Sequence, residues 1–336
     1  MKSNLFFLAV FTASFVSCNN DDDMPSTIPV ESEFKLVTAS NTSGKVTLSD
    51  LSQITPSVMS FMIPSTDADG VYYDSDLDEI VLASRTNNVL EVYGNVDNAI
   101  MSASSSLTLS YSSTSNFNNP REIAVSGNKV VVTQDQNAAN SNTNKLLVYQ
   151  KTSNGFTLLN DYTVDFKNWG IFLDGNTLYA TADLTGDIIV FENFFSNANG
   201  TITPTKRITI EGLVRTHGIF YSAKDNRMIL TDVGSATSDN DGGLIVINNF
   251  SSIVSSTANL GTISMSNQMR VYGPNSSLGN PVDVAYDYET NNIYIAERLK
   301  DGGKLLTFSM PTTNADMMPI NSRLEPGISS VYLLRK

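Results

Sequence analysis

Three short apolar segments near the C-terminus decide the fold: Val282-Asp-Val-Ala-Tyr-Asp287, Asn292-Ile-Tyr-Ile-Ala-Glu297 and Lys304-Leu-Leu-Thr-Phe308. Polar or glycine-containing turns separate them, such as Gly302-Gly303. Runs of β-branched and apolar residues bounded by such turns predict antiparallel strands. No stretch of the chain sustains an apolar 3.6-residue period with caps, so we expect an all-β fold.

The first of these segments has five counterparts along the chain, which begin at Asp69, Arg121, Trp169, His217 and Ser329. Their starts are about 50 residues apart with one interval of about 65, and a period of about 40–50 residues with several strands per unit is typical of a β-propeller. An ordinary β-sandwich is the alternative, but it does not account for this self-similarity.

The two ends of the chain complete one repeat between them. Ser329-Ser-Val-Tyr-Leu-Leu334 has almost no chain after it, and its missing partner strands match Lys35-Leu-Val-Thr38, Gly44-Lys-Val-Thr-Leu48 and Val58-Met-Ser-Phe-Met62. We therefore predict a six-bladed β-propeller over residues 34–336, with the ring closed by N- and C-terminal strands that share one blade. Such closure removes an open sheet edge. Seven blades would need two blades between His217 and Val282, where the chain is too short.

The N-terminus predicts export and lipidation. A short basic start is followed by an apolar stretch from Leu5 to Val16, which is too short to span a membrane but fits a signal peptide. The stretch ends at Phe15-Val-Ser-Cys18, which resembles a bacterial lipoprotein box with Phe15 where Leu is usual. We expect residues 1–17 to be the signal peptide and Cys18 to be acylated; an ordinary signal with an incidental cysteine is the alternative. Cys18 is the only cysteine, so a disulfide or a cysteine zinc site is not expected.

Residues 18–33 predict a tether between the lipid and the domain. Asn19-Asn-Asp-Asp-Asp23 is an acidic, solvated run, and a stretch containing Ser and Pro follows it. The run also resembles the export signal that Bacteroidota lipoproteins carry directly after the cysteine. This resemblance implies an outer-membrane protein held by its lipid anchor and exposed at the cell surface.

Charge restricts the partners. The net charge is −13, with 21 basic and 34 acidic residues and no basic cluster. A nucleic acid is not expected as a partner, because binding its phosphates requires a positive face. Neutral polar side chains on the surface do not identify a ligand. The classes of partner that are left are a small molecule, a glycan and a protein.

One mouth of the predicted channel gathers charged and aromatic side chains. The inner strands begin there with Asp69, Arg121, Trp169, His217, Val282 and Ser329, and the second strands end there. Ligands bind at such mouths in closed β-architectures, and Trp169 and His217 are the only Trp and His of the chain. A structural, hydrogen-bonded role is the alternative for His217. The predicted ligand-binding residues are Asp69, Arg121, Trp169, His217, Arg85, Gln134, Asp183, Glu297 and Arg298.

The catalytic chemistry that the sequence leaves open is that of a metal ion held by oxygen ligands. One histidine excludes a multi-histidine zinc site, and no phosphate-binding, dinucleotide or nucleophile-elbow motif is present. Glu122, Asp232 and Asp283 are candidate ligands for Ca²⁺ or another hard divalent cation, because such cations prefer carboxylate oxygens. The acidic segment between Asp67 and Glu79 lacks the spacing of a calcium loop, and Asp74 to Glu79 reads better as a turn between two strands.

The blade pattern resembles the NHL and SMP-30/gluconolactonase-like group of six-bladed propellers. The stretches that carry the likeness are Glu79-Ile-Val-Leu-Ala-Ser-Arg-Thr-Asn-Asn-Val-Leu-Glu-Val-Tyr93 and Asn291-Asn-Ile-Tyr-Ile-Ala-Glu-Arg298. Lactonases of this group hold a divalent metal with Glu, Asn and Asp, and Glu122 and Asp283 lie where such ligands would be. No Asn occupies the equivalent layer, since Asn168 lies one step before it.

Two functional hypotheses follow. The first is a surface-tethered, non-catalytic propeller that binds a glycan, a peptide or a partner protein at its channel mouth. The second is a metal-dependent, lactonase-like hydrolase or lyase that acts on a small polar substrate through Glu122, Asp232 and Asp283.

Overall fold

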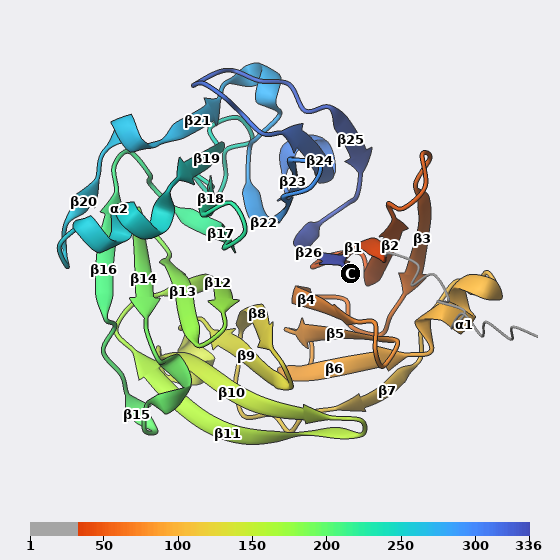
Figure 1. Cartoon of the computed structure of the whole chain (residues 1–336). Helices are drawn as coiled ribbons and strands as arrows, with labels where there is room; N and C mark the ends of the chain where they lie inside the picture. Colours follow the sequence, from red (N-terminus) through yellow and green to blue (C-terminus); the bar gives the residue numbers. More distant parts are fainter. Residues whose placement is uncertain (1–32) are drawn as a thin grey trace, which may run out of the picture. The chain divides into compact units, whose positions relative to one another are not determined.

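The computed structural model describes residues 33–336, which form six sheets arranged as blades around a central channel (Figure 1). The six-bladed β-propeller predicted from the repeats is therefore confirmed. The predicted signal peptide, Cys18 and nearly all of the predicted tether lie outside the described residues.

The closing blade contains both ends of the described chain. From the channel outward, blade 1 consists of β26 (Ile328–Arg335), β1 (Phe34–Ser40), β2 (Lys45–Asp50) and β3 (Ser57–Met62). The C-terminal strand β26 pairs antiparallel with β1, with Leu36 opposite Leu333 and Val37 opposite Tyr332. This pairing is the predicted closure.

The other five blades follow one another along the chain, each with its first strand at the channel. Blade 2 consists of β4 (Ala68–Asp74), β5 (Glu79–Ser84), β6 (Val89–Gly94) and β7 (Leu109–Ser112). Blade 3 consists of β8 (Pro120–Ser126), β9 (Lys129–Gln134), β10 (Asn144–Thr152), β11 (Gly155–Val164) and the short parallel strand β15 (Gly200–Thr201).

Blades 4 to 6 complete the ring. Blade 4 consists of β12 (Asn168–Asp174), β13 (Thr177–Ala182), β14 (Asp187–Phe191), β16 (Lys206–Ile210) and the parallel β20 (Thr262–Ile263). Blade 5 consists of β17 (Thr216–Ser222), β18 (Arg227–Asp232), β19 (Gly243–Asn248) and β21 (Met269–Tyr272). Blade 6 consists of β22 (Pro281–Asp287), β23 (Asn292–Glu297), β24 (Lys304–Ser309) and β25 (Asn321–Leu324).

Short helices lie between the outer strands. The two α-helices among the described residues are α1 (Val96–Met101) and α2 (Phe250–Ser256), and neither is long and apolar enough to cross a membrane. Short 3₁₀ turns occupy Ala138–Asn140, Phe194–Ser196, Met265–Asn267, Pro274–Ser276 and Lys300–Gly302.

The core lies between neighbouring blades. Every residue of β5 is buried, and so are all but the first residues of β9, β18 and β23. Strands covered on both faces in this way read as apolar runs, which is why they were recognisable in the sequence.

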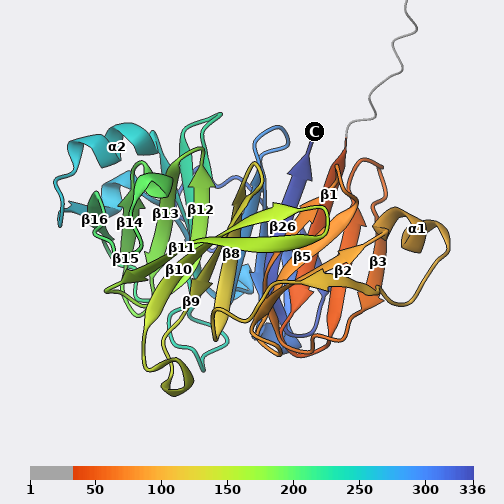
Figure 2. The ribbon, with the colours of Figure 1, turned by 90° about the horizontal axis from the view of Figure 1, so that it is seen from below.

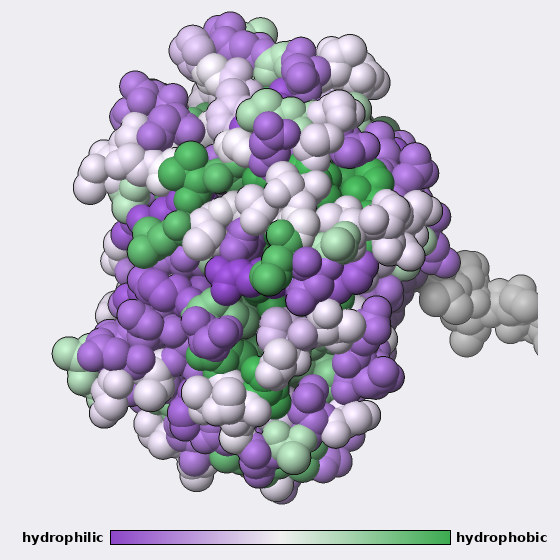
Figure 3. All heavy atoms as spheres, turned by 90° about the vertical axis from the view of Figure 1, so that its left-hand side faces the viewer, coloured by the Kyte–Doolittle hydropathy of each residue, from purple (hydrophilic) through white to green (hydrophobic). Residues whose placement is uncertain are grey.

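On the outer flank of blades 4 and 5, hydrophobic side chains are interspersed with hydrophilic ones (Figure 3).

The inner strands all run in the same direction along the channel, so the propeller has two distinct faces. The strands begin at one face and end at the other, where β26 finishes (Figure 2). Glu33, at the start of the described chain, lies at this second face, because its carbonyl accepts a 2.9 Å hydrogen bond from the Lys336 amide.

Candidate functional site

A repeated backbone hydrogen bond fixes the face where the inner strands begin. In each blade, the amide just after the second strand donates to a carbonyl just before the inner strand, at 2.7 to 3.1 Å. The six donors are Asn41, Arg85, Asp135, Asp183, Val233 and Arg298. These side chains consequently project from equivalent positions around one mouth of the channel.

A β-bulge re-aims the first residues of the inner strands. The register shifts near the start of β4, β8, β12, β17 and β22. A bulge sets two residues against one on the partner strand and turns a side chain to a new direction. Arg121, Trp169 and His217 therefore line the mouth, while the following residues in blades 3 and 6, Glu122 and Asp283, line the channel behind it.

Three consecutive blades contribute a stack of flat side chains to this mouth. The Trp169 and His217 rings lie 3.7 Å apart between centroids and 8° from parallel. The guanidinium carbon of Arg121 lies 4.1 Å from the Trp169 centroid. Such cation–π and stacking contacts hold large side chains in one orientation.

A buried ion network orients His217. Its Nε2 lies 3.0 Å from Asp183 Oδ1, and Asp183 also accepts a 2.7 Å hydrogen bond from Arg215 Nε. Burial lowers the pKa of His217 to about 4, although Asp183 acts to raise it. Burial acts to raise the pKa of Asp183, but hydrogen bonds from His217 and Arg215 outweigh it and hold that pKa below its usual value.

The protonation state of His217 follows from this network. At neutral pH the ring is uncharged and Asp183 is ionised, so the ring proton lies on Nε2 and is donated to Asp183. Nδ1 is then an acceptor, and it has no hydrogen-bond partner among the described residues.

Four guanidinium groups line a pocket of about 160 Å³ at this mouth, and no carboxylate does so. We call this pocket, lined by Arg85, Arg121, Arg215 and Arg298 together with Trp169 and His217, the arginine mouth. The carboxylates that pair with the arginines lie behind the surface, as Asp69 does at 3.3 Å from Arg85 and 3.5 Å from Arg121. Within residues 33–336 Arg298 has no ion pair, and its guanidinium meets the side-chain amide of Asn41.

Five of the nine predicted ligand-binding residues line the arginine mouth, namely Arg85, Arg121, Trp169, His217 and Arg298. Asp69 supports Arg85 and Arg121 through ion pairs, and Asp183 supports His217 through a hydrogen bond. Gln134 and Glu297 instead fix loops: Gln134 accepts from the Asn118 amide, and Glu297 accepts from the amides of Gly279, Asn280, Leu299 and Lys300. Sequence reasoning missed Arg215 and Asn41, which lie in loops that the strand alignment did not cover.

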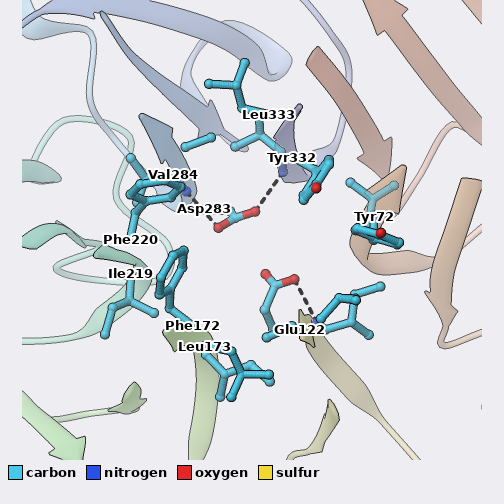
Figure 4. Close-up of a pocket in the computed structure, with 17 residues that line it drawn as sticks. Tyr72, Glu122, Phe172, Leu173, Ile219, Phe220, Asp283, Val284, Tyr332 and Leu333 are labelled. Carbon is cyan, nitrogen blue, oxygen red and sulfur yellow. Dashed lines mark hydrogen bonds between the residues drawn. The ribbon is translucent and has the colours of Figure 1, made fainter. Parts of the chain in front are cut away.

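A larger cavity, of about 290 Å³, lies behind this mouth, among residues nearer the ends of the inner strands and so toward the second face. Figure 4 shows the side chains that line it. Aromatic side chains from four inner strands form its walls: Tyr72, Phe172, Phe220 and Tyr332. Tyr72 meets Tyr332 edge-on at 5.0 Å between centroids, and Phe172 lies 4.8 Å from Phe220. We call this the aromatic cavity. Sequence reasoning did not single it out, although each of these residues lies two positions after Gly70, Gly170, Gly218 or Ser330, which share the strand position of Glu122 and Asp283, as period-2 alternation requires.

Glu122 and Asp283 face one another in the aromatic cavity (Figure 4). They come from blades 3 and 6, which are opposite each other in a ring of six. Asp283 accepts from the amides of Val284 and Val331 at 2.7 Å and from the Ser330 hydroxyl at 3.0 Å. Glu122 Oε1 accepts from the Ile123 amide at 2.8 Å.

Burial raises the pKa of both carboxyl groups. For Glu122 the charge of Asp283 adds to this effect, and the pKa lies well above its usual value. Burial raises the pKa of Asp283 to about 7, although the hydrogen bonds from Val331, Val284 and Ser330 oppose the change. Perturbed carboxyl groups in a concave site are candidates for function.

The third predicted metal ligand lies elsewhere. Asp232 accepts from the amides of Val214 and Arg215 and from the Tyr272 hydroxyl, so it fixes the loop that leads into β17. No group of three or more His, Cys, Asp or Glu residues among the described residues is arranged to hold a metal ion. The structure thus brings Glu122 and Asp283 together without Asp232.

Comparison with known proteins supports the fold. No family model matches the sequence, and no curated protein matches it. Among solved structures, a chain of the nidogen–laminin complex has a TM-score of 0.61 at 13% identity, covering 89% of this chain and 98% of that chain. A Bacteroides caccae protein of unknown function has a TM-score of 0.57 at 9% identity, covering 90% and 100%.

A third similar structure is a Bacteroides fragilis protein whose suggested activity is that of a 6-phosphogluconolactonase. It has a TM-score of 0.55 at 10% identity, covering 92% of this chain and 99% of that chain. At these identities the likenesses concern the propeller fold alone.

Proposed function

We propose that the protein is a lipid-anchored propeller of the outer-membrane surface that binds an acidic ligand at the arginine mouth. The observation that carries the proposal is the Arg121–Trp169–His217 stack, flanked by the guanidinium groups of Arg85, Arg215 and Arg298. Guanidinium groups bind carboxylates and phosphates in a forked geometry, and the half-buried Trp169 ring beside them provides an apolar surface for the body of the ligand. An acidic glycan, or an acidic side chain of a peptide or protein, has this chemistry.

The position of Glu33 supports a surface role. The chain enters the propeller at the face where β26 ends, and the arginine mouth opens at the other face. The predicted tether is joined at residue 33, so its point of attachment lies at the face opposite the arginine mouth and does not itself obstruct the mouth.

The anchor itself is tested by Cys18→Ala. We expect the variant to leave the membrane fraction, because bacterial lipoproteins are held by their acyl chains. Membrane association that persists unchanged in the variant would rule out the lipid anchor.

The binding proposal is tested through Trp169, whose fluorescence is specific to the mouth because the chain has one tryptophan. The probes are D-glucuronate, inorganic phosphate and a pentaglutamate peptide, with glucose and pentaglutamine as uncharged controls. We expect a saturable fluorescence change with at least one acidic probe and none with the controls. Arg298→Gln should weaken this response without altering folding, because within the described residues its guanidinium has no ion pair to lose, only the hydrogen bond to Asn41. Silence of all three acidic probes would contradict the proposal.

A metal-dependent, lactonase-like hydrolase of the NHL and SMP-30/gluconolactonase-like group is the second candidate. The observation in its favour is the pair of opposed carboxyl groups, Glu122 and Asp283, in the channel. A bound divalent ion would raise the melting temperature by mass action. Melting with Ca²⁺ and with chelator therefore tests it: an ion-dependent rise that is lost in Glu122→Gln, Asp283→Asn favours the hydrolase, and indifference of both proteins counts against it.

A further inference from the structure

We propose that the aromatic cavity is a second binding site, separate from the arginine mouth, and that it takes a small organic ammonium ion with an aromatic or branched apolar body. The proposal goes beyond the one for the arginine mouth, because it concerns another cavity, the opposite face and a ligand of opposite charge.

The cavity has the construction of a small-molecule site. All six inner strands contribute to its lining, and its volume of about 290 Å³ suits a molecule of modest size. Such sites combine mostly apolar walls with a few placed polar groups. Here the walls are rings and aliphatic side chains such as Leu173 and Leu333, and Glu122 and Asp283 provide the acidic groups.

One carboxyl oxygen in the cavity, Glu122 Oε2, lacks a hydrogen-bond partner among the described residues. Glu122 is 8% exposed, and Figure 4 shows its carboxyl group pointing into the cavity. Its Oε1 accepts from the Ile123 amide, whereas its Oε2 has no hydrogen bond to any described residue. Across the channel, Asp283 uses both oxygens to accept from Val284, Val331 and Ser330. A ligand donor placed between the two groups would complete the hydrogen bonding of Glu122.

The surroundings favour a cationic donor. No Lys, Arg or His lines the cavity, so the two carboxyl groups have no positive partner there. A buried carboxylate without a countercharge is costly, and an ammonium group supplies both the charge and the hydrogen bonds. The rings of Tyr72, Phe172, Phe220 and Tyr332 provide apolar walls for the body of the ligand, and aromatic rings also attract cations.

The test is calorimetric titration with 2-phenylethylamine, with 2-phenylethanol as the uncharged ligand of matched shape. We expect saturable binding of the amine and at least about tenfold weaker binding of the alcohol.

Two variants assign the binding to the cavity. Glu122→Gln keeps an acceptor for the Ile123 amide and should reduce amine affinity about tenfold or more, whereas Arg298→Gln, in the arginine mouth, should leave it unchanged. The proposal would be overturned if the amine did not bind, or if amine and alcohol bound equally. It would also be overturned if Glu122→Gln retained full affinity for the amine, or if Ca²⁺ bound in the cavity and excluded the amine. The acidic probes of the arginine mouth are read independently, so either proposal can fail alone.

Discussion

Glu122 lowers the stability of the folded protein at high pH. Burial and the charge of Asp283 raise its pKa well above the usual value, so between the unfolded and folded pKa values the folded state holds more protons. Stability is accordingly lost as the pH rises through this window. We expect Glu122→Gln to melt higher than the wild type at pH 8, by a few degrees, on the order of 1 kcal/mol. The difference in melting temperature should vanish near pH 4. A lower melting temperature of Glu122→Gln than of the wild type at pH 8 would contradict the raised pKa of Glu122.

Gly170 is required by a close approach between blades 4 and 5. A Cβ atom there would lie well inside contact distance of the His217 carbonyl oxygen. Gly170→Ala should therefore displace the Trp169–His217 stack and destabilise the fold by about 1–3 kcal/mol or more. Gly155→Ala is the matched control, because no atom lies within 4 Å of the added methyl group. Urea unfolding measures both, and equal midpoints would refute the steric argument.

Residues at the ends of repeated strands or directly after them were predictable as neighbours of the mouth, but the direction of each side chain and the residues of other loops, such as Arg215, were not. Arg121, Trp169 and His217 were placed at the mouth because they occupy the same position in repeated strands, and they line it. Gln134, Asp232 and Glu297 were also predicted from position, but they turn toward backbone amides. Loop conformation determines those amides, and a strand alignment does not contain it. Ligand binding by the mouth stays a prediction.

Lys151 joins two neighbouring blades. It lies on β10 of blade 3, and its Nζ is 3.0 Å from Asp74 and 2.6 Å from Glu79 of blade 2. The group is buried, so Lys151→Met would leave two carboxylates without a countercharge, at a cost of about 3–5 kcal/mol. Lys145→Met is the control on the same strand: its pair with Asp161 is partly exposed, and we expect less than about 1 kcal/mol. Comparable losses in the two variants, measured by urea unfolding, would argue against the bridge.

The strands were predictable because each is an apolar run between turns, but the bulges and helices were not. A bulge depends on the register between two strands, which one strand alone does not reveal. The helices α1 and α2 are too short to sustain a helical period. A local signal existed nonetheless: Asn95 and Asn249, each directly before a helix, adopt the left-handed conformation, with φ of 59° and 52°. Asn tolerates this conformation better than most residues.

The closure of the ring concerns the whole molecule. Deleting residues 329–336 would remove nearly all of β26, which pairs with β1 and lines the channel with Val331, Tyr332 and Leu333. We expect a loss of several kcal/mol, on the order of 25 cal/mol per Å² of apolar surface uncovered. Removal of Lys336 alone should cost about 1 kcal/mol or less, because its ion pair with Asp76 is exposed and its amide makes a single backbone hydrogen bond, to Glu33. An unshifted melting temperature in the longer deletion would show that β26 does not close the ring.

The hydrogen bond between Lys336 and Glu33 also shows that the two ends of the described chain lie side by side. The two positions are adjacent, so a short peptide would join them, and the chain could then be opened at another exposed turn, such as the one at Gly127. The point where the polypeptide begins is in this sense arbitrary. Opened between two blades instead of within one, the same ring would have no blade shared between the chain ends, because β26, β1, β2 and β3 would then be consecutive strands.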